Sequence, residues 1–153
     1  MYQLKFPFTA RREGVDVEFT ELPLPEIITV GMMRKVPVGQ QLLFAHCLTE
    51  VCANLNPFDA AKLQTPDAFG YLEQVNALGL LEDFEEAGFV TPTIKPVKAL
   101  VAKITADFQR QPIEFCAQVL QHSGLKREFI DALDCRAFSP AVPGITAVFF
   151  DPN

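Results

Sequence analysis

Prolines divide this chain into short segments, and several stand where a helix can begin. Twelve prolines occur in 153 residues. Asn56-Pro57 and Thr65-Pro66 each place a capping side chain directly before a proline, whose missing N–H costs nothing in the first helical turn. Pro112 precedes another helical apolar pattern. The sequence therefore predicts short, proline-started helices over much of its length.

The first 22 residues follow a different pattern, in which apolar and polar residues alternate. The alternation covers residues 2–8 and, less regularly, residues 15–22, and a period of two is typical of a half-buried strand. Residues 9–14 are polar and end in glycine, which predicts an antiparallel hairpin with a longer loop. Pro7 has no N–H for a ladder hydrogen bond, so it limits the first strand to an edge or a solvent-facing side.

Apolar spacing from residue 29 onward predicts successive helices. Thr29 can cap a short helix, a longer helix follows from Val38, and a third runs from Pro66 to Leu78, where Gly79 is placed to end it. The apolar positions of the longer helix form one broad stripe, expected to be buried: Leu42, Leu43, Ala45, Cys47, Leu48, Val51 and Cys52. The core positions that we predict are Leu43, Leu48, Val51, Leu72 and Val75.

The second half repeats the helical character after a linker. Residues 82–86 are mostly acidic and predict a solvated face, and residues 91–96 have the prolines and threonines of a linker. Helical spacing then extends over residues 97–108, Pro112 starts a further helix, and Ser123 can cap a third. Residues 145–150 are β-branched and aromatic, which predicts a C-terminal strand that could pair with the hairpin.

These elements predict a mainly α-helical fold with a small N-terminal β-hairpin (α+β), its short helices packed in a bundle. We divide the chain into residues 1–88, with the hairpin and one helical half, and residues 89–153, with a second helical half; one continuous domain is the alternative. The halves share a spacing that aligns Phe44 with Phe115 and Phe69 with Phe138. A duplication and a chance likeness between helical segments both explain it.

The overall charge and the lack of long apolar runs narrow the classes of function. The formal net charge of −6 disfavours nucleic-acid binding, because phosphate backbones repel an acidic protein. No apolar run approaches the roughly 20 residues that span a bilayer, so we expect no membrane partner. The N-terminal residues alternate and lack the apolar core of a signal peptide. We therefore expect a cytoplasmic protein.

The cysteines and histidines do not form a recognisable reactive or metal-binding pattern. The cysteines are Cys47, Cys52, Cys116 and Cys135, and none lies in a C-x-x-C pair, so we expect reduced thiols, no disulfide, no metal and no cofactor. His46 is adjacent to Cys47 on the predicted helix, and adjacent side chains point about 100° apart. His122 lies near a probable helix end, where it can interact with free carbonyls. We predict no catalytic residues.

Several short motifs resemble those of bacteriophage and prophage tail assembly chaperones. They are residues 19–24 (FTELPL), residues 29–33 (TVGMM), residues 55–58 (LNPF) and residues 63–69 (LQTPDAF). The resemblance covers about residues 15–80, roughly half of the chain. It implies a non-enzymatic protein that binds the long, hydrophobic, helical tape-measure protein, keeps it soluble and helps to recruit tail-tube subunits.

The resemblance and the composition together give the functional hypotheses. Our first is such a chaperone, with Met32, Met33, Phe58 and Phe69 as partner-binding residues; for the two methionines, core packing is the alternative. The alternatives are a structural tail or head-completion protein and a small helical enzyme that uses His46 or His122. Self-association stays open. A holdase for helices requires apolar grooves, and the 14 phenylalanines can supply them.

Overall fold

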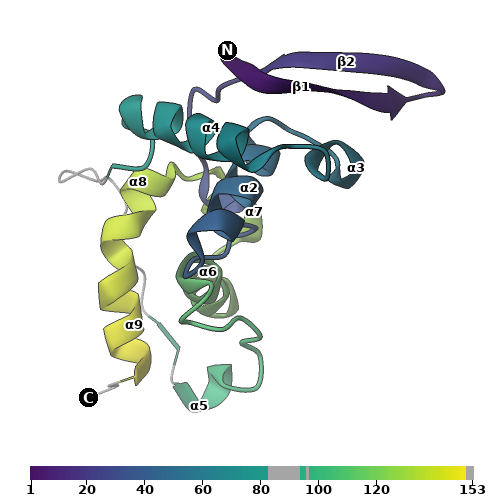
Figure 1. Ribbon diagram of the computed structural model, residues 1–153. Helices are drawn as coiled ribbons and strands as arrows, with labels where there is room; N and C mark the ends of the chain where they lie inside the picture. The colour runs from purple at the N-terminus through teal and green to yellow at the C-terminus, as the bar shows by residue number, and fades with distance from the viewer. Residues whose placement is uncertain (83–93, 96, 151–153) are drawn as a thin grey trace.

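The computed structural model describes residues 1–82, 94–95 and 97–150, and the predicted fold class is confirmed. An N-terminal hairpin is followed by short helices (Figure 1). The elements are β1 (Tyr2–Arg12), β2 (Val15–Leu22), α1 (Val30–Met33), α2 (Gln41–Cys52), α3 (Pro57–Ala60), α4 (Thr65–Ala77), α5 (Val97–Leu100), α6 (Pro112–His122), α7 (Arg127–Ala132), α8 (Cys135–Phe138), the 3-10 helix η1 (Ser139–Ala141) and α9 (Val142–Phe150).

The hairpin is longer than predicted, and its turn is shorter. The strands pair antiparallel up to Arg12 and Val15, so the predicted loop over residues 9–14 is wrong. Only Glu13 and Gly14 form the turn, with φ of 52° and 78°, the left-handed values of a two-residue hairpin turn. The far end of β1 is held by the helices, because Lys62 donates to the Thr9 carbonyl and Arg12 pairs with Asp59. The register shifts between Gln3 and Phe8, the part of β1 that contains Pro7.

A first hydrophobic cluster lies between α2, α4 and the near end of the hairpin. α4 packs against both α2 and β1, as Figure 1 shows. Of the predicted core residues, Leu48 and Val75 are fully buried, whereas Val51 and Leu72 are half-buried against the cluster. The prediction for Leu43 is wrong, because its exposed fraction is 45%.

A second cluster lies between α6, α7, α8 and α9, and it interlocks with the first. Val30 of α1 belongs to the second cluster, while Cys135 of α8 belongs to the first. Their backbones are paired: the Val30 amide donates to the Leu133 carbonyl at 2.8 Å, and the Cys135 amide donates to the Ile28 carbonyl at 2.8 Å. The proposed boundary at residue 88 lies outside the described residues, and the division into two halves stays a prediction.

The second half departs from the sequence prediction in three places. The helix predicted over residues 97–108 ends at Leu100, and the amides of Thr105 and Ala106 donate to the side-chain oxygen of Gln118 instead of to helix carbonyls. Ser123 caps the C-terminus of α6 and does not begin the next helix. The predicted C-terminal strand is helix α9.

Other sequence predictions lie wholly or partly outside the described ranges. These predictions are the linker over residues 91–96 and the acidic run after Glu82. All four cysteines are described, and all four are free thiols. In the part of the chain that the structure describes, no helix is both long enough and apolar enough to cross a membrane.

Candidate functional site

The two histidines do not lie in an arrangement suited to acid–base chemistry. The Nε2 atom of His46 is 3.3 Å from the Thr65 hydroxyl, at an exposed contact between α2 and α4. His122 is the last residue of α6. Among the described residues, no carboxylate lies within hydrogen-bonding distance of either ring, so neither histidine has the orienting partner of a general base.

A polar hollow of about 650 Å³ lies where α1 meets α6 and α7. Arg34 lines it: the guanidinium donates to Glu114 at 2.5 Å, to Asp131 at 2.8 Å and to Gln121 at 3.3 Å. Hydrogen bonding to Glu114 raises the pKa of Arg34 above its usual value. Two carboxylates therefore already neutralise this guanidinium, and the ion pairs of Arg34 act as a clamp that joins the end of α1 to α6 and α7.

Gly31 explains why the motif of residues 29–33 fits this clamp. A Cβ atom at Gly31 would lie 2.9 Å from the Cβ of Asp131 and 3.2 Å from its carbonyl oxygen. Thr29 caps α1 by accepting from the Met32 amide at 3.2 Å, and the Met32 sulfur accepts from the Thr29 amide at 3.5 Å. The predicted start of this helix is therefore confirmed, and a glycine is required where α1 crosses α7.

The structure distributes the four predicted partner-binding residues over three helices. Met33 is buried in the first cluster with 7% of its surface exposed. Met32 is half-buried beside its cap, and Phe69 is half-buried against the first cluster. Phe58 on α3 is 81% exposed. These residues do not form one exposed surface.

A more continuous apolar surface runs along α2, where the sequence predicts burial. Leu43 is exposed, and Cys47 and Val51 are half-buried. These three residues, which we call the α2 row, are spaced i, i+4 and i+8, so they share a helix face over about 12 Å. Leu42, 50% exposed, flanks the row at its first turn. Only Ala45, Leu48 and Thr49 of this helix are fully covered.

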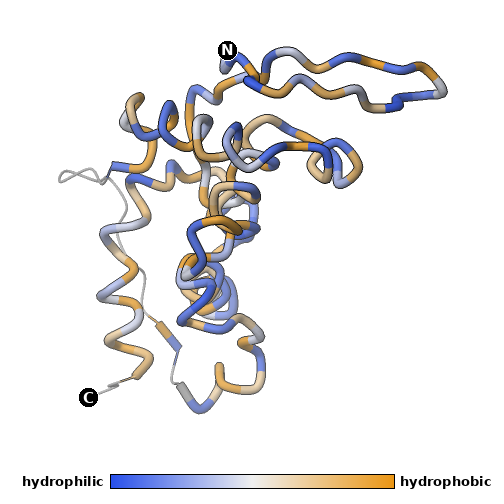
Figure 2. The backbone as a smooth tube through the Cα atoms, in the orientation of Figure 1, coloured by the Kyte–Doolittle hydropathy of each residue, from blue (hydrophilic) through white to orange (hydrophobic). Residues whose placement is uncertain are grey.

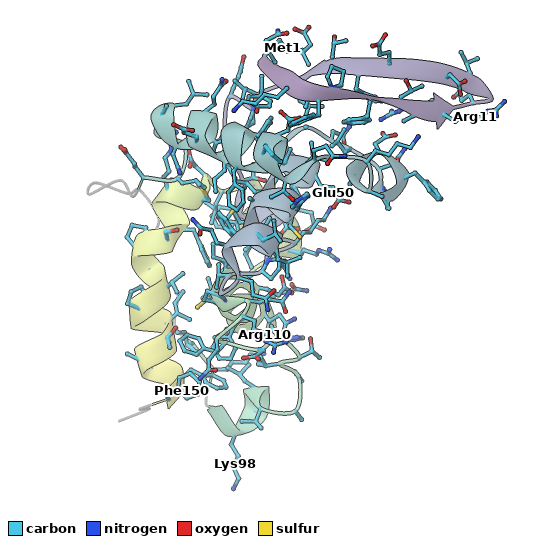
Figure 3. The ribbon with its side chains drawn as sticks, in the orientation of Figure 1. Met1, Arg11, Glu50, Lys98, Arg110 and Phe150 are labelled. Atoms are coloured by element: carbon cyan, nitrogen blue, oxygen red, sulfur yellow. The ribbon has the colours of Figure 1, made fainter. Side chains whose placement is uncertain are left out.

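Two hollows lie near the two ends of α2. The first, of about 530 Å³, begins beside the exposed leucine; its lining residues are Pro37, Val38, Gly39, Gln40, Leu43, Gln109 and Arg110. The second, of about 400 Å³, lies between β2 and the segment that follows α2; we call it the hairpin groove. Its lining residues are Arg12, Val17, Phe19, Glu21, Leu22, Pro23, Ala53, Asn54 and Leu55. Figure 3 draws the side chains of this part of the molecule, with Glu50 labelled on α2 and Arg110 labelled in the second half.

The surroundings of the two thiols of α2 disfavour the thiolate form. Burial raises the pKa of Cys47, with a contribution from Glu50, and burial raises the pKa of Cys52 to about 12. A thiol with a raised pKa stays protonated and is a poor nucleophile and metal ligand. Within the described ranges, no group of three or more His, Cys, Asp or Glu residues is placed to hold a metal ion. The α2 row is therefore suited to apolar contact.

Sequence reasoning missed this surface for a physical reason. Seven apolar positions share one broad stripe, and periodicity marks the stripe without showing which part a neighbour covers. α4 covers the side with Leu48, and the first turn of α2 extends past it. The exposed leucines could have been identified only from that packing.

Comparison with known proteins does not identify a family for this chain. No family model matches the chain, and neither a curated protein nor a solved structure shows significant similarity to it.

Proposed function

We propose that this protein is a non-enzymatic tail assembly chaperone that binds an apolar helical segment of a tape-measure-type partner in the cytoplasm. The observation that carries the proposal is the α2 row, an apolar surface left accessible on a helix whose pattern predicts burial. Contiguous exposed apolar surface is typical of contact sites for other proteins, and Leu42 and Leu43 are the most exposed apolar side chains of this helix. The motifs that resemble the tail assembly chaperones support the identity of the partner.

The spacing of the α2 row favours a helix as the bound element. Residues at i, i+4 and i+8 form one of the ridges by which helices pack, with axes about 8–10 Å apart. The three residues of the row carry no charge, and Glu50, i+7 from Leu43, is an acidic neighbour on the same helix face. The hollow beside Leu43 offers room for a large apolar side chain of the partner.

Co-expression with the tape-measure protein of the same genome tests the proposal. We expect the partner to become soluble and to elute with this chain on size exclusion. Leu43→Asp should abolish the complex, because a carboxylate in an apolar contact loses its hydration. Leu78→Asp is the matched control, since Leu78 is 54% exposed on a different helix. A partner that stays equally insoluble with and without this chain would refute the proposal.

Cys47 offers a second readout that depends on contact and not on solubility. A bound helix should slow alkylation of this thiol by a maleimide, while alkylation of Cys52, outside the row, changes less. His46→Ala and His122→Ala should leave the complex intact, whereas a histidine-dependent enzyme would lose its activity. A chain that forms large assemblies alone, without a partner, would instead point to the structural tail or head-completion protein.

A further inference from the structure

The outer edge of β2 is open for pairing with another strand. Among the described residues the sheet has two strands, β1 and β2, and all of β2 except Leu22 is exposed or half-buried. A two-residue turn closes on a hydrogen-bonded pair, here Arg12 and Val15, and the backbone groups of a strand alternate in direction. The N–H and C=O groups of Asp16, Glu18 and Thr20 therefore point to the open edge.

The two faces of β2 differ in chemistry. Asp16 and Glu18 share one face with Thr20, and neither carboxylate takes part in an ion pair found in the described part of the chain. The opposite face carries Val17 and Phe19, which line the hairpin groove together with Arg12 and Glu21. The Glu21 carboxylate accepts a hydrogen bond from the Gln3 side chain. An acidic face, a largely apolar face and an open backbone edge thus occur on one strand.

We infer that the β2 edge binds an extended segment of another protein whose side chains alternate between basic and apolar. Its backbone would pair with the open groups of β2, which is the mode of strand addition. Its basic side chains, two residues apart, would lie opposite Asp16 and Glu18. Its apolar side chains would extend over the hairpin groove toward Leu55. This goes beyond the binding of a helix at the α2 row, and it does not depend on it.

β1 already shows that β2 accepts such a neighbour. Across the existing ladder, Arg11 lies opposite Asp16, Ala10 opposite Val17 and Phe8 opposite Phe19, and the two phenylalanine rings stack at 5.0 Å. β1 therefore presents a basic side chain on the acidic face and apolar ones on the other, and the segment that we infer repeats this pattern on the open edge.

A second copy of the chain does not fit the same edge. Antiparallel pairing of β2 with β2 keeps the acidic faces together, so Asp16 and Glu18 would lie across from the same residues of the other copy. Like charges directly opposite destabilise a ladder. Acidic residues on an edge strand also protect it from self-association. The charge of this strand therefore selects a basic partner.

Peptide binding followed by amide NMR tests the inference. The probe is a capped eight-residue peptide that alternates lysine and valine, and its counterpart with glutamate in place of lysine is the charge-reversed control. We expect the lysine peptide to bind, with slower hydrogen exchange confined to the amides of Asp16, Glu18 and Thr20. Its affinity should fall as salt rises, because exposed charges are screened. N-methylation of alternate peptide bonds should abolish binding.

Charge reversal in the protein sharpens the test. Asp16→Lys/Glu18→Lys should weaken the lysine peptide about tenfold or more and favour the glutamate peptide. Glu26→Lys/Glu128→Lys changes the net charge equally at exposed sites outside the hairpin, and it should leave the affinity within about twofold. Thr20→Pro removes one outward N–H and should weaken binding while the acidic face stays intact. Circular dichroism confirms that each variant is folded.

Three outcomes would overturn the inference. They are the absence of binding at millimolar lysine peptide, protection that falls on the helices, and equal affinity for the glutamate peptide. Concentration-dependent dimers with protected β2 amides would instead assign the edge to a second copy.

Discussion

β1 and α9 both bury apolar side chains against the helices, but they differ in the further contacts that fix them. β1 is held by directed polar contacts: the Asp67 carboxylate, buried on α4, accepts from the Tyr2 hydroxyl at 3.0 Å and from the amides of Lys5 and Phe6 at 2.7 Å and 3.0 Å. These contacts occupy backbone groups of β1 where its register with β2 shifts. The carboxylate therefore replaces part of the missing ladder.

α9 is held by rings. The Phe149 ring centroid lies 4.9 Å from that of Phe115, and the Phe150 centroid lies 5.4 Å from that of Phe108. Its side chains include no charge, and Figure 2 shows it as mostly apolar while the hairpin alternates. The polar contacts of α9 are long: the Cys116 sulfur donates to the Val142 carbonyl at 3.8 Å and lies 3.7 Å from the Thr146 hydroxyl.

The two kinds of contact have different effects on how precisely each element is placed. Hydrogen bonds to a charged group depend on direction, so Asp67 fixes the hairpin at one register on α4. Ring contacts depend mainly on buried area, with a weaker preference for edge-to-face or offset geometry, so α9 is fixed largely by how much surface it covers. A hairpin fixed in this way can present β2 in a defined orientation.

The largest expected effect is on the ring contact. Phe115→Ala should lower the free energy of unfolding by about 3–5 kcal/mol, because the ring is 4% exposed and touches three other rings. Urea denaturation measures it. Phe150→Ala is the control, since Phe150 is 60% exposed and should cost about 1 kcal/mol or less. Equal costs at both positions would mean that α9 is not held by its buried rings.

The second largest expected effect on stability is at Asp67, the buried carboxylate that holds β1. Asp67→Ala should cost about 2–3 kcal/mol, because it removes three hydrogen bonds to a buried charge, although water can reach the freed amides of Lys5 and Phe6 at exposed residues. Hydrogen exchange should accelerate at those two amides and not in α9. Asp67→Asn keeps one acceptor oxygen and should recover part of the loss. Unchanged exchange at Lys5 and Phe6 would show that the carboxylate does not hold β1.

Tyr2 gives a smaller effect with a distinct dependence on pH. Tyr2→Phe should cost about 1 kcal/mol near neutral pH. Burial, with the hydrogen bond to Asp67, raises the pKa of Tyr2 from 10.0 to about 12, so the folded state keeps this proton after the unfolded state has lost it. The stabilisation is complete below pH 10 and is lost as the pH rises toward 12.

Denaturant titrations at several pH values between 8 and about 12 measure this dependence. The variant should show a shallower loss of stability above pH 10 than the original chain. Burial also raises the pKa of Tyr71, so part of the loss remains in the variant. Identical slopes for the two proteins would contradict the role given to Tyr2.

The smallest expected effect is on the polar contacts of α9. Thr146→Val should change stability by less than about 0.5 kcal/mol, since a thiol is a weak donor and the hydroxyl lies far from it. Thermal melts of this variant and of Tyr2→Phe compare the polar contacts of the two ends directly. A larger loss for Thr146→Val would remove the contrast between them.

Local signals account for the parts of the fold that the sequence predicts. Alternation over residues 2–8 and 15–22 identifies the hairpin, although Leu22 is the one buried residue of β2. Thr29 and Asn56 cap their helices through side chains that bond nearby amides, and Pro112 begins α6. Leu48 and Val75 are buried as predicted. The strand alternation and the helix caps depend on residues close together in the chain, and the sequence determines them, whereas the burial of the two core residues also requires distant neighbours.

Contacts between distant residues decide the rest. Residues 145–150 form a helix because Phe149 and Phe150, adjacent in sequence, both reach Phe115, and a short apolar run alone fits a strand equally well. Beyond Leu100 the expected helix is absent, and the distant Gln118 side chain accepts from the amides of Thr105 and Ala106.

The candidate surfaces follow the same division. Local pattern gives α2 its broad apolar stripe, but only the packing of α4 leaves Leu43 exposed and makes the α2 row available. The sequence places three acidic residues on β2, but only Asp67, Asp59 and Lys62 on the helices fix which edge of the hairpin stays open. Burial and the pairing of backbone groups belong to the assembled chain, because each depends on which distant residues pack against a given surface.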